Sequence, residues 1–215
     1  MSQTIHQTVE IPAPTVGEIE VGGITRSSFI LRGALAAGGL YGLGAVTPFV
    51  SAAFAESGGG DVEILNFALT LEYLETDFYK VKAKSLKLSG AVRNVAAEFG
   101  DQEAQHVDAL TKAIQGAGGM PAKKPTFVFP ATDEKSFLGL AYVLENTGVG
   151  AYNGAGPAIK NVALLAAAGS VVQVEARHAA TIGLLSKQSV VPNGGFDKPL
   201  TKQQVLAKAG PLIKS

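Results

Sequence analysis

The sequence predicts an all-α protein built around an antiparallel four-helix bundle. Two observations carry this prediction: a Glu-x-x-His pattern that occurs twice, and an internal repeat that relates the two copies. Residues 103–106 read Glu-Ala-Gln-His and residues 175–178 read Glu-Ala-Arg-His, so the two histidines are 72 residues apart. Because positions i and i+3 lie on one face of an α-helix, each pattern presents a carboxylate beside an imidazole.

The repeat extends beyond these two patterns. Glu72 is followed seven residues later by Tyr79, and Glu145 is followed seven residues later by Tyr152. The chain therefore resembles a duplicated helical hairpin whose halves meet about a pseudo-two-fold axis. Two Glu-x-x-His helices, with two helices that each supply one glutamate, form the ligand set of a dimetal carboxylate site in a bundle.

The first helix is predicted over residues 62–85, after a glycine-rich joint, and Asp61 can cap it. An apolar stripe that includes Glu72 follows this helix. The other members of the stripe are Leu65, Ala68, Leu69, Phe78 and Tyr79. A carboxylate on such a stripe must be paired or bound to a metal, because burying it alone costs several kcal/mol.

Three more helices complete the predicted bundle. The second spans 89–116, the third 134–153 and the fourth 157–187, with Pro157 in its first turn. The proline-rich stretch 118–133 is long enough to run the length of a helix and cross to its far end. The predicted domain limits are 1–55 for a leader with a signal-like segment, 56–188 for the bundle, and 189–215 for a tail with one short helix near 201–209.

The N-terminal segment has the features of an export signal. Residues 1–24 are polar and are expected to be a disordered leader, and an apolar run from Gly33 to Ala55 follows the basic residues at 26 and 32. The run ends in Ala-Phe-Ala, which fits the small-x-small rule for cleavage. The stretch resembles a twin-arginine signal that lacks the second arginine, because Ser27 takes its place. The expected location is periplasmic, in the cell envelope or extracellular.

Two other interpretations of this segment stay open. An uncleaved run of about 20 apolar residues can span a bilayer, so residues 29–55 could anchor the chain in a membrane. The third interpretation is a soluble helix, which the many glycines and Pro48 disfavour.

Composition excludes several classes of function. The formal net charge is zero, with 18 basic and 18 acidic residues, so nucleic-acid binding has no electrostatic support. The absence of cysteine excludes disulfides, thiolate zinc sites and cysteine nucleophiles. At 47% hydrophobic and 17% charged residues, the chain is not of the disordered class.

The candidate metal ligands are those that the repeat supplies in matching pairs. They are Glu72, Glu103, His106, Glu145, Glu175 and His178. A single Glu-x-x-His would be weak evidence, because with 12 glutamates in 215 residues it arises by chance for about one histidine in eighteen. Two matches at the offset of the repeat are far more specific.

Several other residues are weighed against this set. Glu75 lies one turn after Glu72, but its equivalent in the second half is Gly148. We therefore expect Glu75 to be a surface charge or to contact a ligand residue without itself binding the metal. Tyr79 and Tyr152 are expected to pack in the core, with a hydrogen bond to a ligand or a redox role near the metals as the alternative. The acidic residues expected on solvated helix faces are Glu98, Asp101 and Asp108, and His6 in the leader has no assigned role.

Four carboxylates and two imidazoles suit two iron ions, with manganese as the alternative. Two such ions can react with dioxygen or hydrogen peroxide, and Fe(II) can itself be a substrate.

The segments 64–75 (Ile-Leu-Asn-Phe-Ala-Leu-Thr-Leu-Glu-Tyr-Leu-Glu), 145–152 (Glu-Asn-Thr-Gly-Val-Gly-Ala-Tyr) and 174–179 (Val-Glu-Ala-Arg-His-Ala) are similar to the ferritin-like domain family, which includes desiccation-related proteins of plants and bacteria. The resemblance covers residues 60–187 and implies a ferritin-like bundle with a dimetal site, often on an exported protein. It implies no defined reaction.

Three functions therefore compete. The first is an exported oxidoreductase whose diiron centre oxidises Fe(II) with dioxygen or peroxide and limits damage during drying or envelope stress. The second is a manganese catalase-like enzyme, and the third is an envelope protein whose metals only stabilise the bundle. Homo-oligomers stay open, but iron storage in a hollow shell is disfavoured, because nothing in one sequence demonstrates the interfaces that a shell needs.

Overall fold

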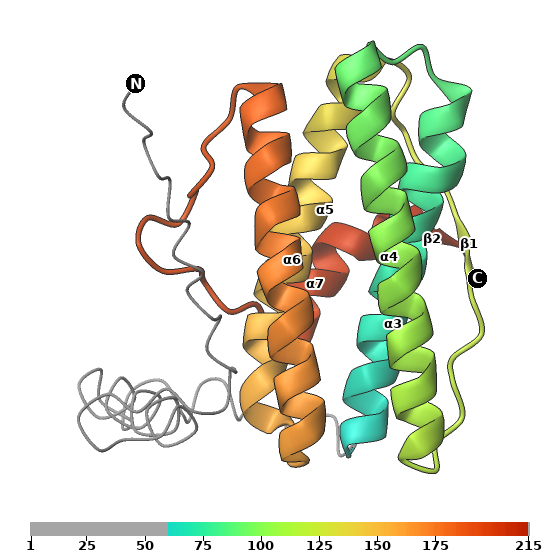
Figure 1. Cartoon of the computed structure of the whole chain (residues 1–215), viewed down its shortest axis with the longest axis vertical. Coiled ribbons are helices and arrows are strands. Elements are labelled where there is room, and N and C mark those ends of the chain that lie inside the picture. Colours follow the sequence, from blue (N-terminus) through green and yellow to red (C-terminus); the bar gives the residue numbers. More distant parts are fainter. Residues whose placement is uncertain (1–59, 215) are drawn as a thin grey trace, which may run out of the picture. The chain divides into compact units, whose positions relative to one another are not determined.

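The computed structural model describes residues 60–214, and these residues form the predicted four-helix bundle (Figure 1). The helices are α3 (Asp61–Asp77), α4 (Gly90–Gly116), α5 (Glu134–Ala155) and α6 (Val162–Ser186). The predicted leader and the signal-like segment lie outside the described residues. Within residues 60–214, no helix is both long enough and apolar enough to cross a membrane.

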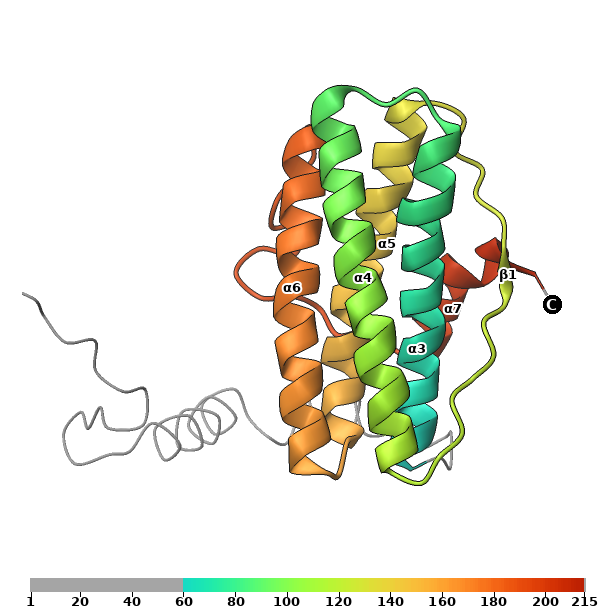
Figure 2. The ribbon, with the colours of Figure 1, turned by 45° about the vertical axis from the view of Figure 1, so that its right-hand side comes forward.

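The connection between α4 and α5 is the long crossover that the sequence predicts. It runs along the outside of α3, so that α4 and α5 point the same way while α3–α4 and α5–α6 are antiparallel pairs (Figure 2). The side chain of Asn66 on α3 holds it by donating to the carbonyl of Met120 at 3.0 Å and accepting from the backbone N–H of Ala122 at 2.6 Å. Such a crossover is typical of ferritin-like bundles.

The first helix is not uniformly α-helical, as predicted over 62–85, but changes its winding after Asp77. A π-helical segment spans Phe78–Lys82 and a 3₁₀ turn spans Ala83–Ser85. The consecutive side chains of Phe78 and Tyr79 at the start of this π turn are both buried. Single π turns within helices are uncommon and occur frequently at functional sites.

The N-terminal cap of α3 differs from expectation. The N-cap of α3 is Gly60, and Asp61 does not cap this helix. The carboxylate of Asp61 instead accepts hydrogen bonds from the backbone N–H groups of Lys160 and Asn161 at 2.9 and 2.8 Å. These bonds tie the start of α3 to the start of α6.

The fourth helix begins at Val162 rather than at residue 157. Pro157 lies in a separate 3₁₀ turn, Gly156–Ala158, and the chain is extended at Ile159. Asn161 then caps α6, because its side-chain oxygen accepts from the backbone N–H groups of Ala163 and Leu164. Pro157 thus lies at the start of the 3₁₀ turn, a first-turn position that suits proline, and Asn161 marks the start of α6.

The tail packs on the bundle. Helix α7 (Lys202–Ala209) matches the predicted short helix, and its Val205 and Ala209 belong to the same core cluster as Phe78 and Phe137. After a 3₁₀ turn, Gly210–Leu212, strand β2 (Ile213–Lys214) pairs antiparallel with β1 (Thr126–Phe127) in the crossover. The end of the tail therefore fixes the middle of the crossover.

Candidate metal centre

The interior of the bundle contains an unusual concentration of ionisable side chains. Its buried members, besides two tyrosines, are Glu72, Glu75, Glu103, Glu145, Glu175, His106 and His178. No lysine or arginine of residues 60–214 is buried with them. Five buried carboxyl groups cost far more than two imidazoles can compensate unless protons or cations neutralise them.

All six candidate ligands lie in this cluster, and they form two overlapping groups. One group is Glu72, Glu103, His106 and Glu175, and the other is Glu103, Glu145, Glu175 and His178. Within each group one ligand atom per residue lies within 4.8 Å of all the others. Glu103 and Glu175 belong to both groups, so these two carboxylates would be available to both ions.

The first group converges on one imidazole nitrogen. Nδ1 of His106 lies 3.0 Å from Oε2 of Glu103, 3.2 Å from Oε2 of Glu72 and 3.1 Å from Oε1 of Glu175. Three helices, α3, α4 and α6, therefore bring their side chains to one point.

The second group converges in the same way on His178. Its Nδ1 lies 2.8 Å from Oε1 of Glu103 and 3.4 Å from Oε2 of Glu145. The two oxygens of Glu103 thus face the two imidazoles, whose ring centres are 6.4 Å apart. One carboxylate spans both halves of the site.

Several atoms of the cluster have no hydrogen-bond partner among the described residues. They are Oε1 of Glu103, Oε2 of Glu145, both carboxylate oxygens of Glu175 and Nδ1 of His178. Nδ1 of His178 and Oε1 of Glu103 are close, but their alignment is not that of a hydrogen bond. Buried polar atoms are normally satisfied, and oxygen and nitrogen lone pairs aimed at a common centre suit a cation. These residues therefore fit the two metal ions that the sequence predicts.

The two tyrosines are not only core residues. The hydroxyl of Tyr79 donates a short hydrogen bond to Oε1 of Glu145, and the hydroxyl of Tyr152 donates one to Oε1 of Glu72. Each half of the repeat therefore holds the glutamate of the other half. The structure therefore contains the predicted alternative, in which each tyrosine donates a hydrogen bond to a candidate ligand.

Gln102 is a residue of the site that the sequence did not reveal. Its Oε1 lies 2.6 Å from Nε2 of His178. An amide oxygen only accepts, so Nε2 of His178 carries a proton toward Gln102 and Nδ1 is the ring nitrogen that faces the carboxylates. The repeat gave no signal for this contact, because the residue equivalent to Gln102 is Val174.

Glu75 corrects one expectation. It is not a surface charge, because only 2% of the residue is exposed. Its place is next to Gly148, where an added Cβ would lie 3.5 Å from Oε1 of Glu75 and 2.9 Å from Oε2 of Glu175. The other acidic residues expected on solvated faces, Glu98, Asp101 and Asp108, are exposed.

The electrostatics of the cluster favour protonation of Glu72 and of both histidines, but not of Glu103. Burial raises the pKa of Glu72 to about 8. Burial also acts to raise the pKa of Glu103, but the neighbouring imidazoles outweigh it and lower that pKa to about 2. Burial acts to lower the pKa of the histidines, but the surrounding carboxylates raise it to about 12 for His106 and about 10 for His178. Metal ions that bind here must displace these protons.

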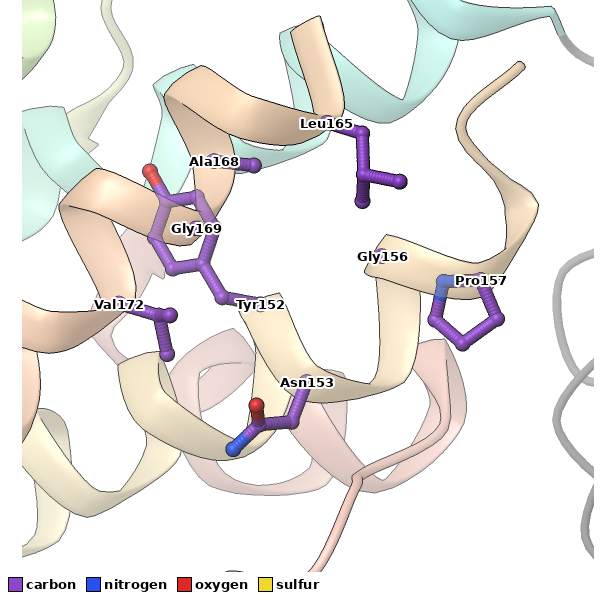
Figure 3. Close-up of a pocket in the computed structure, with 8 residues that line it drawn as sticks. All are labelled: Tyr152, Asn153, Gly156, Pro157, Leu165, Ala168, Gly169 and Val172. Carbon is purple, nitrogen blue, oxygen red and sulfur yellow. The ribbon is translucent and has the colours of Figure 1, made fainter. Parts of the chain in front are cut away.

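Several cavities border the cluster, and residues of α6 line two of them. One, of about 380 Å³, lies between α4 and α6, and both histidines and Gln102 line it. The other, of about 330 Å³, is mainly apolar and has the ring of Tyr152 on its wall, beside Ala168 and Val172 (Figure 3). The first cavity borders the imidazoles, of which His106 is 8% and His178 1% exposed, and the second borders a tyrosine that contacts Glu72.

The fold and this cluster define a four-helix-bundle protein whose buried glutamates and histidines can bind metal ions. A family model for the ferritin-like domain matches residues 60–188. The match covers more than half of the 215 residues, and the chain belongs to the ferritin-like domain family. No curated protein matches the chain.

Proposed function

We propose that this chain is an exported dimetal oxidoreductase that binds two iron ions and oxidises Fe(II) with dioxygen or hydrogen peroxide. The observation that carries the proposal is the pair of overlapping groups that share Glu103 and Glu175. Glu72 and His106 complete one ion position, and Glu145 and His178 complete the other. Iron bound there supplies two-electron chemistry with oxygen species.

The protein residues around the site have definable tasks. Tyr79 and Tyr152 orient Glu145 and Glu72 through their hydroxyl groups. Gln102 fixes the tautomer of His178. Burial of the carboxylates excludes bulk water, and the cavity between α4 and α6 is the route that we expect Fe(II) or peroxide to take.

The location outside the cytoplasm and the role in drying or envelope stress rest on the sequence. The signal-like segment 25–55 supports export, and the resemblance to desiccation-related proteins supports stress protection. Secretion of the full chain by its source cell, followed by N-terminal sequencing of the exported form, tests export. Cleavage after Ala55 is expected, and retention of the apolar run in the membrane fraction would support an anchor instead.

The activity is tested with the full chain loaded anaerobically with Fe(II). On addition of dioxygen or peroxide, we expect oxidation of the bound Fe(II) faster than that of free Fe(II) in the same buffer, read as loss of chelatable Fe(II). The double variant Glu103→Ala/His178→Ala should lose this effect, and Asp108→Asn, an exposed change on α4, should keep it.

Two other results would redirect the assignment. Oxygen evolution from peroxide by the manganese-loaded chain, without accelerated Fe(II) oxidation, would make the protein catalase-like. Tight metal binding with no turnover of either kind would leave the ions a structural role.

A further inference from the structure

Glu75 is the one member of the buried carboxylate set that the six-ligand site does not use. It lies on α3, one helical turn after Glu72, and its Oε1 is near the space above Gly148. Oε2 of Glu175 borders the same space. The side chain of Glu75 therefore points into the layer that holds the candidate ligands and not toward solvent.

Within residues 60–214, the carboxyl group of Glu75 makes no hydrogen bond or ion pair. Glu72 and Glu145 each receive a tyrosine hydroxyl, and Glu103 lies against both imidazoles. The groups that act on Glu75, after burial itself, are the carboxylates of the candidate ligands, Glu175 first, and all of them raise its pKa. No cationic side chain among residues 60–214 is paired with it.

A neutral, hydrogen-bonded acid is the simplest alternative for such a residue, and the geometry disfavours it. The carboxylate that borders the same space as Glu75 is that of Glu175, and neither of its oxygens accepts a hydrogen bond among the described residues. Two adjacent carboxyl groups without a bond between them resemble two ligands that face a common ion.

The repeat shows that room is made for this carboxylate. The first helices of the two halves are offset by 73 residues, since 145 − 72 and 148 − 75 both equal 73. Gly148 therefore occupies the position equivalent to Glu75. Any side chain at Gly148 would meet Oε2 of Glu175 at 2.9 Å, so one half supplies an extra carboxylate and the other leaves the space open.

We infer that Glu75 is a fifth carboxylate ligand of the metal pair, on the side of the site that Glu175 and Gly148 border. The inference rests on the dimetal site of the proposed function. It makes the two halves of the site unequal, because only the first half of the repeat contributes a second glutamate from its first helix.

The test is a Mn(II) titration of the metal-free full chain, in which the electron paramagnetic resonance signal of free Mn(II) reports what is unbound. Two variants remove the ligand: Glu75→Gln keeps the size and Glu75→Leu removes both oxygens. We expect each to weaken binding of at least one ion about tenfold or more, the lower range for residues that support metal sites. Asp108→Asn should bind Mn(II) as the wild type does.

Thermal unfolding of the metal-free variants separates ligation from folding. Removal of a buried, unpaired acid should leave the metal-free chain at least as stable as the wild type. Wild-type Mn(II) affinity in both variants would overturn the inference while leaving the dimetal site intact. A wild-type chain that binds no Mn(II) or Fe(II) would instead contradict the proposed function itself.

Discussion

The hydroxyl of Tyr79 donates a hydrogen bond to Oε1 of Glu145, a residue of the other half of the repeat. Its counterpart, Tyr152, does the same for Glu72. The π-helical segment that begins at Phe78 contains Tyr79. These two crossed hydrogen bonds join the two hairpins at the level of the site. The positions of Glu72 and Glu145 therefore each depend on the opposite half of the repeat.

Replacement of Tyr79 or Tyr152 by phenylalanine should destabilise the metal-free chain. The change keeps the ring but leaves a buried glutamate oxygen without its donor, which costs about 1–3 kcal/mol. Urea unfolding measures the effect. Tyr142→Phe is the control, because its hydroxyl donates to the carbonyl of Ser189 in an exposed bond, and it should cost less. Equal losses in all three variants would show that the crossed bonds have no special weight.

Gln102→Leu should weaken metal binding about 10- to 100-fold with little change in fold. The substitution removes the acceptor for Nε2–H of His178 and frees the imidazole to adopt the other tautomer. Isothermal titration with Mn(II) measures the change. Gln105→Leu, an exposed position on the same helix, is the matched control. An affinity unchanged by Gln102→Leu would exclude Gln102 as a positioning residue.

Gly148→Ala and Gly139→Ala, both on α5, should differ in their effects: the first should lower metal affinity and the second should raise stability. A Cβ at Gly148 would meet Oε2 of Glu175 at 2.9 Å, whereas nothing lies within 4 Å of a Cβ at Gly139. Alanine at Gly139 should stabilise the helix by about 0.5–1 kcal/mol. Alanine at Gly148 should reduce metal affinity by displacing the carboxylate. Thermal unfolding and metal titration check both predictions. Wild-type metal affinity in Gly148→Ala would contradict the close approach of the Glu175 carboxylate to Gly148.

The stability of the metal-free chain should depend on pH in a definite direction. The pKa of Glu72 rises from 4.5 to about 8 and that of His178 from 6.5 to about 10, so both groups stabilise the fold when protonated. Their contribution is complete below pH 4.5 and 6.5 and is lost as pH rises to about 8 and 10. The lowered pKa of Glu103 acts oppositely, and its contribution is lost as pH falls from 4.5 to about 2.

Metal binding should show the reverse dependence above pH 4.5, because ions displace the protons of Glu72 and His178 and bind more tightly as pH rises. Melting temperatures of the metal-free and Mn(II)-loaded chain from pH 5 to 9 test both trends. Parallel curves for the two forms would contradict proton displacement.

The pairs that recur in the repeat were predictable, and the structure brings them together. The i, i+3 spacing of Glu103 and His106, and its copy at Glu175 and His178, fixes both residues on one helix face whatever the tertiary packing. The existence of the four helices followed from the periodicity of apolar residues, and the crossover followed from its prolines and length.

Features that break the repeat were not predictable in the same way. Gln102 contacts His178 on another helix, and Glu75 is buried because Gly148 faces it across the bundle. Both depend on which side chain lies opposite, which a single sequence does not contain. The π turn at Phe78 and the start of α6 at Val162 likewise depend on tertiary packing and on a cap.

Metal content per chain is the most direct test of the central claim that this bundle holds a dimetal centre. Elemental analysis of the full chain, purified after reconstitution with Fe(II) or Mn(II), should give about two ions per chain. The double variant Glu103→Ala/His178→Ala should give close to none, because Glu103 belongs to both ligand groups. A folded wild-type chain that retains no metal, or a double variant that retains as much as the wild type, would contradict the account.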